Sequence, residues 1–296
     1  MRKYIPTILL VVLLGGWALF FDRVTDHLIF EPTDQVYTLQ LPFEEVTFPA
    51  KNGQKLHALY LPAKEDKPTI LFFHGNKYNV YSFQDFARPY AEKGYGVFLF
   101  DYRGYGKSEG SPSESHLYED GSSALFHLML KEKIFPQDIV LWGFSLGNAP
   151  ALYVASTYDK LPFKGVILQS PFTNMADMGF YMLSQRYDGT AAATILPIFL
   201  KPLLWHKNFD NTRLIGRVRA PMLIGFSRLD RTIPWTMSRA LAAKSPRGTQ
   251  QFLSPAGTHH SFEWFESEAL RFLESLDNGG KSSTPASVNT TPAGKS

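Results

Sequence analysis

The chain has 296 residues, of which 44% are hydrophobic and 19% are charged, close to the mix of an ordinary globular protein. This composition excludes a mainly disordered chain, a collagen-like fibre and a coiled coil. Lys and Arg total 30 and Asp and Glu total 27, so the formal net charge is only +3. So small a surplus argues against nucleic-acid binding as the main task. The absence of cysteine excludes disulfides, thiolate metal sites and a cysteine nucleophile.

The N-terminus carries an uncharged run from Ile5 to Phe21, preceded by Arg2 and Lys3. At 1.5 Å per residue this run reaches about 25 Å, the length of a short transmembrane helix. We therefore predict a membrane anchor at residues 1–24 and a single-pass protein. A cleaved signal peptide is the alternative, but the bulky aromatic residues that end the run favour an anchor. The positive charges predict a cytoplasmic N-terminus, with the folded part on the non-cytoplasmic side.

Residues 25–276 alternate between strand and helix patterns and predict one α/β domain. Strands are predicted at residues 44–48, 55–61, 69–73, 96–100, 139–142, 166–168, 222–225 and 250–253. Helices are predicted at residues 83–92, 117–131, 146–157, 236–244 and 263–276. A hairpin signal, Asn52-Gly53, joins the first two strands, and the later strands are short apolar runs typical of a parallel sheet. The pattern predicts a mostly parallel sheet with helices on both faces.

Two segments depart from this alternation. Residues 171–219 contain Pro197, Pro202 and many apolar side chains but no clear strand, which predicts a helical insertion. A cap over the sheet edge and an ordinary connection packed on the core both fit this segment. Residues 277–296 are rich in Gly, Ser, Thr, Pro and Lys, which predicts a disordered tail.

The pentapeptide from Gly143 to Gly147 matches the pattern G-x-S-x-G, with Ser145 at its centre. The same pattern recurs at residues 106–110 around Ser108, so the pattern alone does not identify a nucleophile. A nucleophilic serine of this kind needs a buried strand before it and a helix after it, because the sharp turn between them exposes the hydroxyl. Only Ser145 has both, so we predict Ser145 as the nucleophile and Ser108 as a loop residue.

A serine nucleophile needs a histidine base and an acid that orients the base, in the chain order serine, acid, histidine for this motif. The histidines after Ser145 are His206, His259 and His260. His206 lies in the irregular insertion, whereas the other two lie in a loop between a predicted strand and a helix. Asp230 follows the preceding predicted strand and is therefore the predicted acid.

Two backbone N–H groups are expected to stabilise the negative oxygen that forms when serine attacks a carbonyl. The first is the amide of Leu146, at the start of the helix after the nucleophile. The second is expected from residues 74–77, the loop after the strand at 69–73. His74 in this loop is more typical of a structural residue that ties the loop down through its ring N–H.

Further blocks of the sequence, spanning about residues 43–276, resemble the α/β-hydrolase superfamily and, more narrowly, its membrane-anchored ABHD and Bem-type serine hydrolases. Residues 101–114 begin DYRGYGKSEG and continue with Pro112 and Glu114, very like the group's DYRGYGxSEGxPxE. Residues 74–76 match the group's His-Gly-Asn oxyanion loop. Residues 257–261 read GTHHS and align with its GTHND motif, which selects His259 over His260 as the base.

The resemblance implies hydrolysis of carboxylic esters or thioesters of acyl groups, without metal or cofactor. Lys77 and Tyr78 replace small residues that are usual in the group, so Asn76 is the first choice for the second oxyanion donor and Lys77 is the second. The alternatives to an ester hydrolase are a thioester hydrolase, a serine aminopeptidase, and an inactive hydrolase fold that serves as a binding module.

The predicted substrate is a small acyl ester or a lipid with an apolar acyl group. Two features favour it: the predicted anchor, and the apolar side chains of the insertion, which carries no cluster of charges. The anchor also predicts that the catalytic domain meets this substrate at the membrane, on its non-cytoplasmic side. The sequence leaves any protein partner unknown.

Overall fold

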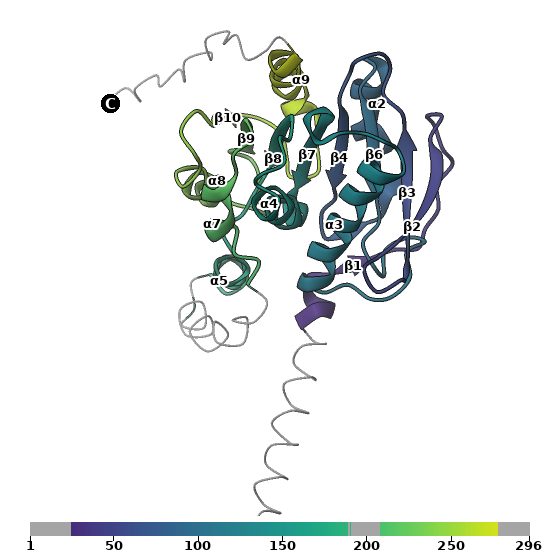
Figure 1. Ribbon diagram of the computed structural model, residues 1–296. Coiled ribbons are helices and arrows are strands. Elements are labelled where there is room, and N and C mark those ends of the chain that lie inside the picture. The colour runs from purple at the N-terminus through teal and green to yellow at the C-terminus, as the bar shows by residue number, and fades with distance from the viewer. Residues whose placement is uncertain (1–24, 189, 191–207, 278–296) are drawn as a thin grey trace, which may run out of the picture.

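An eight-stranded sheet forms the centre of the protein (Figure 1). The computed structural model describes residues 25–188, 190 and 208–277. The strands lie in the order β10-β9-β8-β7-β4-β6-β3-β2. Their bounds, in chain order, are β2 (Glu44–Pro49), β3 (Lys55–Leu61), β4 (Thr69–Phe73), β6 (Gly96–Phe100), β7 (Ile139–Phe144), β8 (Gly165–Gln169), β9 (Met222–Ser227) and β10 (Gln250–Ser254). Strand β3 pairs antiparallel with both β2 and β6, and all other neighbours are parallel.

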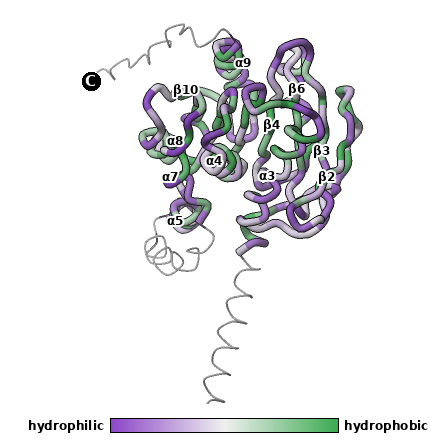
Figure 2. The backbone as a smooth tube through the Cα atoms, in the orientation of Figure 1, coloured by the Kyte–Doolittle hydropathy of each residue, from purple (hydrophilic) through white to green (hydrophobic). Residues whose placement is uncertain are grey.

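Helices cover both faces of the sheet because its central strands are apolar on both sides. Every residue of β4, β6, β7, β8 and β9 is buried. Helices α2 (Gln84–Glu92) and α9 (Glu263–Asp277) pack on one face, and α3 (Glu114–Leu130), α4 (Asn148–Thr157) and α8 (Trp235–Ala242) pack on the other. Successive strand residues therefore alternate between two hydrophobic layers. Figure 2 shows hydrophobic stretches along central strands such as β4.

Aromatic side chains fill much of the layer under α2 and α9. Trp142 of β7 meets Phe86 of α2 edge-on with ring centres 4.9 Å apart, and Phe265 of α9 at 5.9 Å. In the other layer Tyr118 of α3 stacks on Tyr153 of α4 at 4.4 Å. These contacts bury large apolar areas, which fixes the helices against the sheet.

The predicted mostly parallel sheet with helices on both faces is confirmed. The differences lie at element ends and in short elements. The helix expected from residue 146 begins at Asn148, because residues 145–147 form a 3-10 turn. The helix expected from residue 117 begins at Glu114, where the Ser113 hydroxyl accepts a hydrogen bond from the His116 N–H and caps the helix. Strands β1 (Glu31–Pro32) and β5 (Lys77–Tyr78), which pair in parallel outside the main sheet, were not predicted.

Several predictions from the sequence fall wholly or partly outside the described residues. The predicted anchor at residues 1–24 and most of the predicted tail lie outside them. Within the ranges that the structure describes, no helix is long and apolar enough to cross a membrane. The described parts of the predicted insertion contain α5 (Met175–Arg186) and α7 (Asn211–Leu214), as expected for a helical segment. Its role as a cap over the site stays a prediction.

Candidate active site

The turn between β7 and α4 carries Ser145 in a backbone conformation that is rare for residues other than glycine, with φ at +54°. Strain of this kind persists only where the surroundings enforce it. The Asn148 side-chain amide donates to the carbonyls of Ser145 at 2.8 Å and Gln169 at 2.9 Å, which holds the turn against β8. The two flanking glycines are required by space: a Cβ on Gly147 would lie 2.0 Å from the carbonyl oxygen of Phe73, and one on Gly143 would lie 2.6 Å from the Cα of Asn148.

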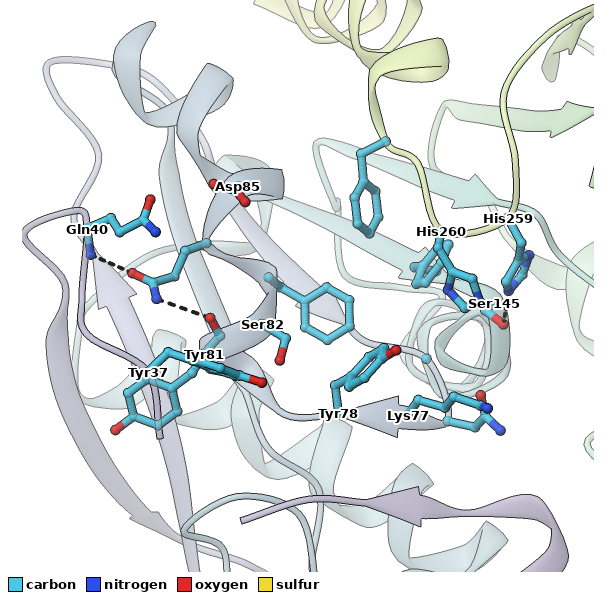
Figure 3. A pocket seen from close by; sticks show the side chains of 16 residues that line it. Tyr37, Gln40, Lys77, Tyr78, Tyr81, Ser82, Asp85, Ser145, His259 and His260 are labelled. Atoms are coloured by element: carbon cyan, nitrogen blue, oxygen red, sulfur yellow. Dashed lines mark hydrogen bonds between the residues drawn. The ribbon is translucent and has the colours of Figure 1, made fainter. Parts of the chain in front are cut away.

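The structure brings Ser145, His259 and Asp230 into one hydrogen-bonded chain. His259 Nε2 lies 2.9 Å from the Ser145 hydroxyl oxygen, and His259 Nδ1 lies 2.7 Å from Asp230 Oδ2. All three residues are buried. Figure 3 shows the contact between Ser145 and His259 at one end of a pocket. The order along the chain, serine, acid, histidine, is the one expected for this motif.

Asp230 is fixed by the turn that follows β9. Its Oδ1 accepts hydrogen bonds from the backbone N–H groups of Thr232 at 2.9 Å and Ile233 at 2.8 Å, so only Oδ2 faces His259. Burial raises the pKa of the Asp230 carboxyl, but hydrogen bonds from His259 and Ile233, together with the charge on His259, outweigh burial and lower the pKa below its usual value. A charged Asp230 favours a His259 tautomer that carries its proton on Nδ1 and accepts a hydrogen bond from serine on Nε2.

His260 lies beside His259 but in a different environment. The two rings meet edge-on with centres 5.1 Å apart, and His260 lines the pocket as an exposed residue. Burial, followed by the charges of His259 and Lys77, lowers the pKa of His260. Of the two histidines, His259 is the one that lies between Ser145 and Asp230.

The loop after β4, residues 74–78, passes directly beside the serine. A Cβ added to Gly75 would lie 3.4 Å from the Ser145 Cβ. His74 is fully buried, and burial lowers the pKa of its ring, which favours the neutral form. Its Nδ1 lies 2.8 Å from the Gly75 carbonyl oxygen, as expected for a structural histidine that donates to its own loop. Gly75, Asn76 and Lys77 all line the pocket that contains Ser145.

The block at residues 101–110 lies under this loop and supports it. The Tyr102 hydroxyl donates to the His74 carbonyl at 3.2 Å, and the Tyr105 hydroxyl donates to the Asn76 carbonyl at 2.8 Å. The Ser108 hydroxyl is instead used in two structural hydrogen bonds. It donates to the Asp101 carbonyl at 2.8 Å and accepts from the His57 N–H at 2.9 Å. The second G-x-S-x-G match is thus a loop that joins β3 to the end of β6.

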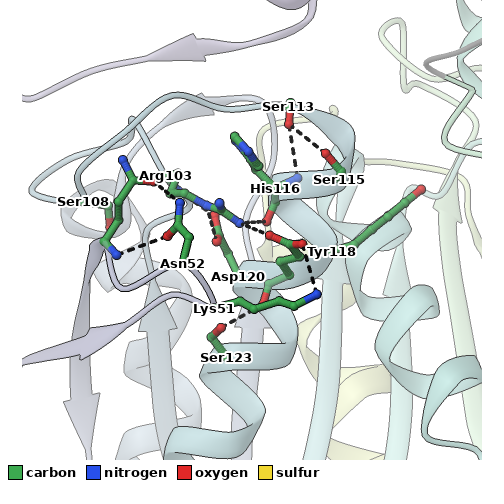
Figure 4. A network of polar contacts seen from close by, with 12 residues as sticks. Lys51, Asn52, Arg103, Ser108, Ser113, Ser115, His116, Tyr118, Asp120 and Ser123 are labelled. Carbon is green, nitrogen blue, oxygen red and sulfur yellow. Dashed lines mark hydrogen bonds and ion pairs between the residues drawn. The ribbon is translucent and has the colours of Figure 1, made fainter.

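Arg103, a residue of this block, ties the block to helix α3 (Figure 4). The side chain is buried, and its Nε donates to Asp120 Oδ1 at 2.7 Å while its backbone N–H donates to Asp120 Oδ2 at 2.8 Å. A second guanidinium nitrogen lies 2.9 Å from Glu119. A buried arginine held by two carboxylates fixes the loop to helix α3, because breaking such a pair leaves a charge without a partner.

The pocket beside Ser145 has a volume of about 410 Å³. Next to the serine its wall is aromatic: Phe144 lies 4.9 Å from Phe262 and 5.2 Å from His259 between ring centres. Phe83 completes this wall, 6.1 Å from Phe262. Tyr37, Gln40 and Asp85 lie at the far end (Figure 3). The sequence did not predict this wall, although Phe144 adjoins the predicted nucleophile and Phe262 follows the predicted base by three positions.

The described part of the chain holds no cluster of three or more His, Asp or Glu side chains suited to a metal ion. The groups in contact at the site are the Ser145 hydroxyl, the His259 ring and the Asp230 carboxyl. A hydroxyl in contact with a carboxylate-oriented imidazole can act as a nucleophile toward a carbonyl.

Comparisons with a family model, with known sequences and with solved structures agree with one another. A family model described as the alpha/beta hydrolase fold matches residues 68–197. The alpha/beta hydrolase domain-containing protein WAV2 of Arabidopsis thaliana is 31% identical over 232 residues, which cover 75% of this chain and 73% of that protein. The membrane protein YNL320W of Saccharomyces cerevisiae is 30% identical over 225 residues, 74% of each chain. An esterase of Pyrococcus furiosus has the same fold, with a TM-score of 0.64 at 17% identity, over 84% of this chain and 98% of that one.

Labelling by a fluorophosphonate is expected to depend on Ser145 and not on Ser108. Ser145→Ala should abolish labelling, because the probe bonds covalently to an activated serine hydroxyl. Ser108→Ala should remain labelled, and should lower the free energy of unfolding by about 1–3 kcal/mol because a buried N–H loses its acceptor. Gel fluorescence and urea unfolding measure the two effects. Loss of labelling in both variants, with folding intact, would contradict the assignment.

The two adjacent histidines are expected to differ in the same assay. His259→Ala should lower the labelling rate of Ser145 by about 10³-fold or more, since the hydroxyl loses its base. His260→Ala should keep a rate within a few-fold of the unmodified protein, because His260 holds neither Ser145 nor Asp230. The rate constants come from a time course at several probe concentrations. If His260→Ala is the inactive variant, the base has been placed one residue too early.

Proposed function

Because the chain belongs to the α/β-hydrolase family, we propose that it is a serine hydrolase that cleaves carboxylic esters through an acyl-enzyme. One observation carries this proposal: the hydrogen-bonded chain from Asp230 through His259 to Ser145, with distances of 2.7 and 2.9 Å. The strained backbone of Ser145 is a second support, because it presents the hydroxyl at the end of the sheet.

In the proposed first half-reaction, His259 Nε2 takes the proton of the Ser145 hydroxyl while the serine oxygen attacks the ester carbonyl carbon. The carbonyl oxygen becomes negative in the tetrahedral intermediate. Asp230 stays charged and stabilises the protonated imidazole. The imidazole then gives its proton to the leaving alcohol as the carbon–oxygen bond breaks, which leaves the acyl group on Ser145.

In the second half-reaction water replaces the alcohol. His259 takes a proton from water, the resulting oxygen attacks the acyl carbon, and the carboxylic acid leaves as Ser145 regains its proton. The negative oxygen of both intermediates is expected to accept hydrogen bonds from the Leu146 N–H and from the N–H of Asn76, with Lys77 as the second choice. Removing one such donor typically costs about 10²–10³ in kcat.

The aromatic wall favours an apolar acyl group as the substrate's reacting part. Phe83, Phe144 and Phe262 border the pocket beside Ser145, and all three present ring surface rather than polar groups. Each buried CH₂ of an acyl chain gains about 0.8 kcal/mol. The polar far end, with Gln40 and Asp85, suits chains that stop before it. We infer esters or lipids with short to medium acyl chains.

The proposal includes a membrane location. The uncharged run from Ile5 to Phe21 is the sequence feature that supports an anchor, and the relative YNL320W is named a membrane protein. The charges of Arg2 and Lys3 favour a single pass with the catalytic domain on the non-cytoplasmic side. An apolar substrate would then be met where such molecules concentrate.

Acyl-chain selectivity tests the aromatic wall. For p-nitrophenyl esters from acetate to decanoate, kcat/KM of the full chain in detergent should rise about tenfold or more toward medium chains. Phe262→Ala should flatten this rise, because the longer chains lose their ring contact, while acetate changes less. Phe135→Ala removes an exposed aromatic outside the pocket and should leave the profile unchanged. A steady fall beyond butyrate would replace the lipid reading with a short-chain esterase.

The anchor is tested by mass spectrometry of the protein purified from the whole culture, cells and medium together. Peptides that contain Leu9 to Trp17 should be present, because an uncleaved anchor keeps its apolar run. Recovery of the protein in the membrane fraction after a carbonate wash should accompany this result. A mature N-terminus that begins after Phe20 would show a cleaved signal peptide instead.

A further inference from the structure

The segment at residues 29–35, here called the strap, runs alongside the loop that is expected to supply the second oxyanion donor. Part of the strap is β1, which pairs in parallel with β5 in that loop, Glu31 opposite Lys77 and Pro32 opposite Tyr78. Figure 1 shows β1 close to the first described residues of the chain, and its pairing with β5 connects these residues to the loop beside Ser145. No motif of the family resemblance covers it.

Asn76 of the loop forms hydrogen bonds with the strap through both its side chain and its backbone carbonyl. Its side-chain amide donates to the Ile29 carbonyl at 3.0 Å. Its own carbonyl accepts two hydrogen bonds, from the Glu31 N–H at 2.9 Å and from the Tyr105 hydroxyl at 2.8 Å. A carbonyl has two lone pairs, so these two donors saturate it and fix its direction.

Fixing this carbonyl also fixes the N–H of the next residue. A trans peptide is planar, and its N–H points opposite to its C=O. The Asn76 carbonyl points to the strap and to Tyr105, so the Lys77 N–H points away from both. The preceding peptide is fixed in the same way, because His74 Nδ1 holds the Gly75 carbonyl at 2.8 Å and thereby sets the Asn76 N–H. Both candidate donors therefore have an orientation set by hydrogen bonds on their partner carbonyls.

The strap is itself held by further hydrogen bonds and by ring packing. The Thr33 carbonyl accepts from the Gly106 N–H at 3.0 Å and from the Asn79 side chain at 3.0 Å. The same Asn79 amide donates to the Gln35 carbonyl at 2.8 Å. Phe30 is buried and meets Phe209 edge-on, with ring centres 6.3 Å apart. The strap is thus a fixed support rather than a loose N-terminal extension.

We propose that the strap is a positioning element of the oxyanion site. Its Glu31 N–H orients the Asn76–Lys77 peptide, which carries the second-choice donor, and its Ile29 carbonyl holds the side chain of Asn76, the residue that carries the first-choice donor. The inference rests on the proposed function. Its physical basis is that stabilisation of an oxyanion requires N–H donors already aimed at the position where the charge develops. Loosening the peptide should weaken binding of the transition state more than binding of the substrate.

The test compares Glu31→Pro with Glu31→Ala in the full chain. Both variants remove the exposed ion pair between Glu31 and Lys77. Only the proline variant also removes the N–H donor, so the difference between the two variants reports on that donor. Glu31 lies in the two-residue strand β1, which pairs only with β5 among the described residues, and proline is tolerated in strands of this kind at a sheet edge. Relative to the alanine variant, the proline variant should lower kcat on p-nitrophenyl butyrate about tenfold or more, with KM changed less than about threefold.

A transition-state analogue separates positioning from a merely structural role. An alkyl trifluoromethyl ketone adds to an active serine and places a negative oxygen in the oxyanion site. Its inhibition constant should rise in the proline variant by the same factor as kcat/KM falls. Equal kcat and equal inhibition constants in the two Glu31 variants, with only the melting temperature changed, would overturn the proposal.

Tyr105→Phe supplies a second route should the proline variant fold poorly. It removes the other donor on the Asn76 carbonyl and keeps the ring in place. Alone it should lower kcat and weaken the ketone in parallel, and combined with Glu31→Pro the two losses should not add, because both act on one peptide. Strict additivity would contradict the shared peptide. If the unmodified protein neither hydrolyses the ester nor labels at Ser145, the proposed function fails before the strap is tested.

Discussion

The close approach of the start of α4 to the end of β4 is the constraint on which the candidate site depends. At Gly147 a side chain would collide with the Phe73 carbonyl at 2.0 Å, so only glycine lets the helix start reach the sheet. Two residues before this contact, the turn at Ser145 has its rare backbone conformation, with φ at +54°. The same contact brings the loop after β4 beside the serine, where its backbone N–H groups become candidate donors.

That loop has almost no regular structure of its own, so its shape comes from remote parts of the chain. Hydroxyls of Tyr102 and Tyr105 hold it from the block after β6, and residues 29–35 hold it from the N-terminal side. The block is in turn anchored by the buried Arg103–Asp120 pair. Many weak hydrogen bonds therefore act on the few peptides of this loop, which is the rigidity that an oxyanion site requires.

Electrostatics and packing both orient His259 in the candidate site. Backbone N–H groups fix one oxygen of Asp230, which leaves the other for His259 and keeps the carboxylate charged despite burial. Phe144 packs against the His259 ring, with ring centres 5.2 Å apart, and forms part of the aromatic wall of the pocket. A histidine held between a charged carboxylate and an apolar ring is oriented without added polar groups that would compete for its proton.

The sequence by itself determined the sheet, its helices and the residues of the candidate triad, because apolar periodicity and the strand–turn–helix context of Ser145 are local signals. It also placed Ser108 in a loop, since Glu109 to Pro112 cannot continue a helix. The aromatic wall, the strap and the pairing of Glu31 with Lys77 were decided only by the tertiary structure. Each of these joins residues far apart along the chain through backbone groups or ring faces, and such groups leave no periodic pattern in the sequence.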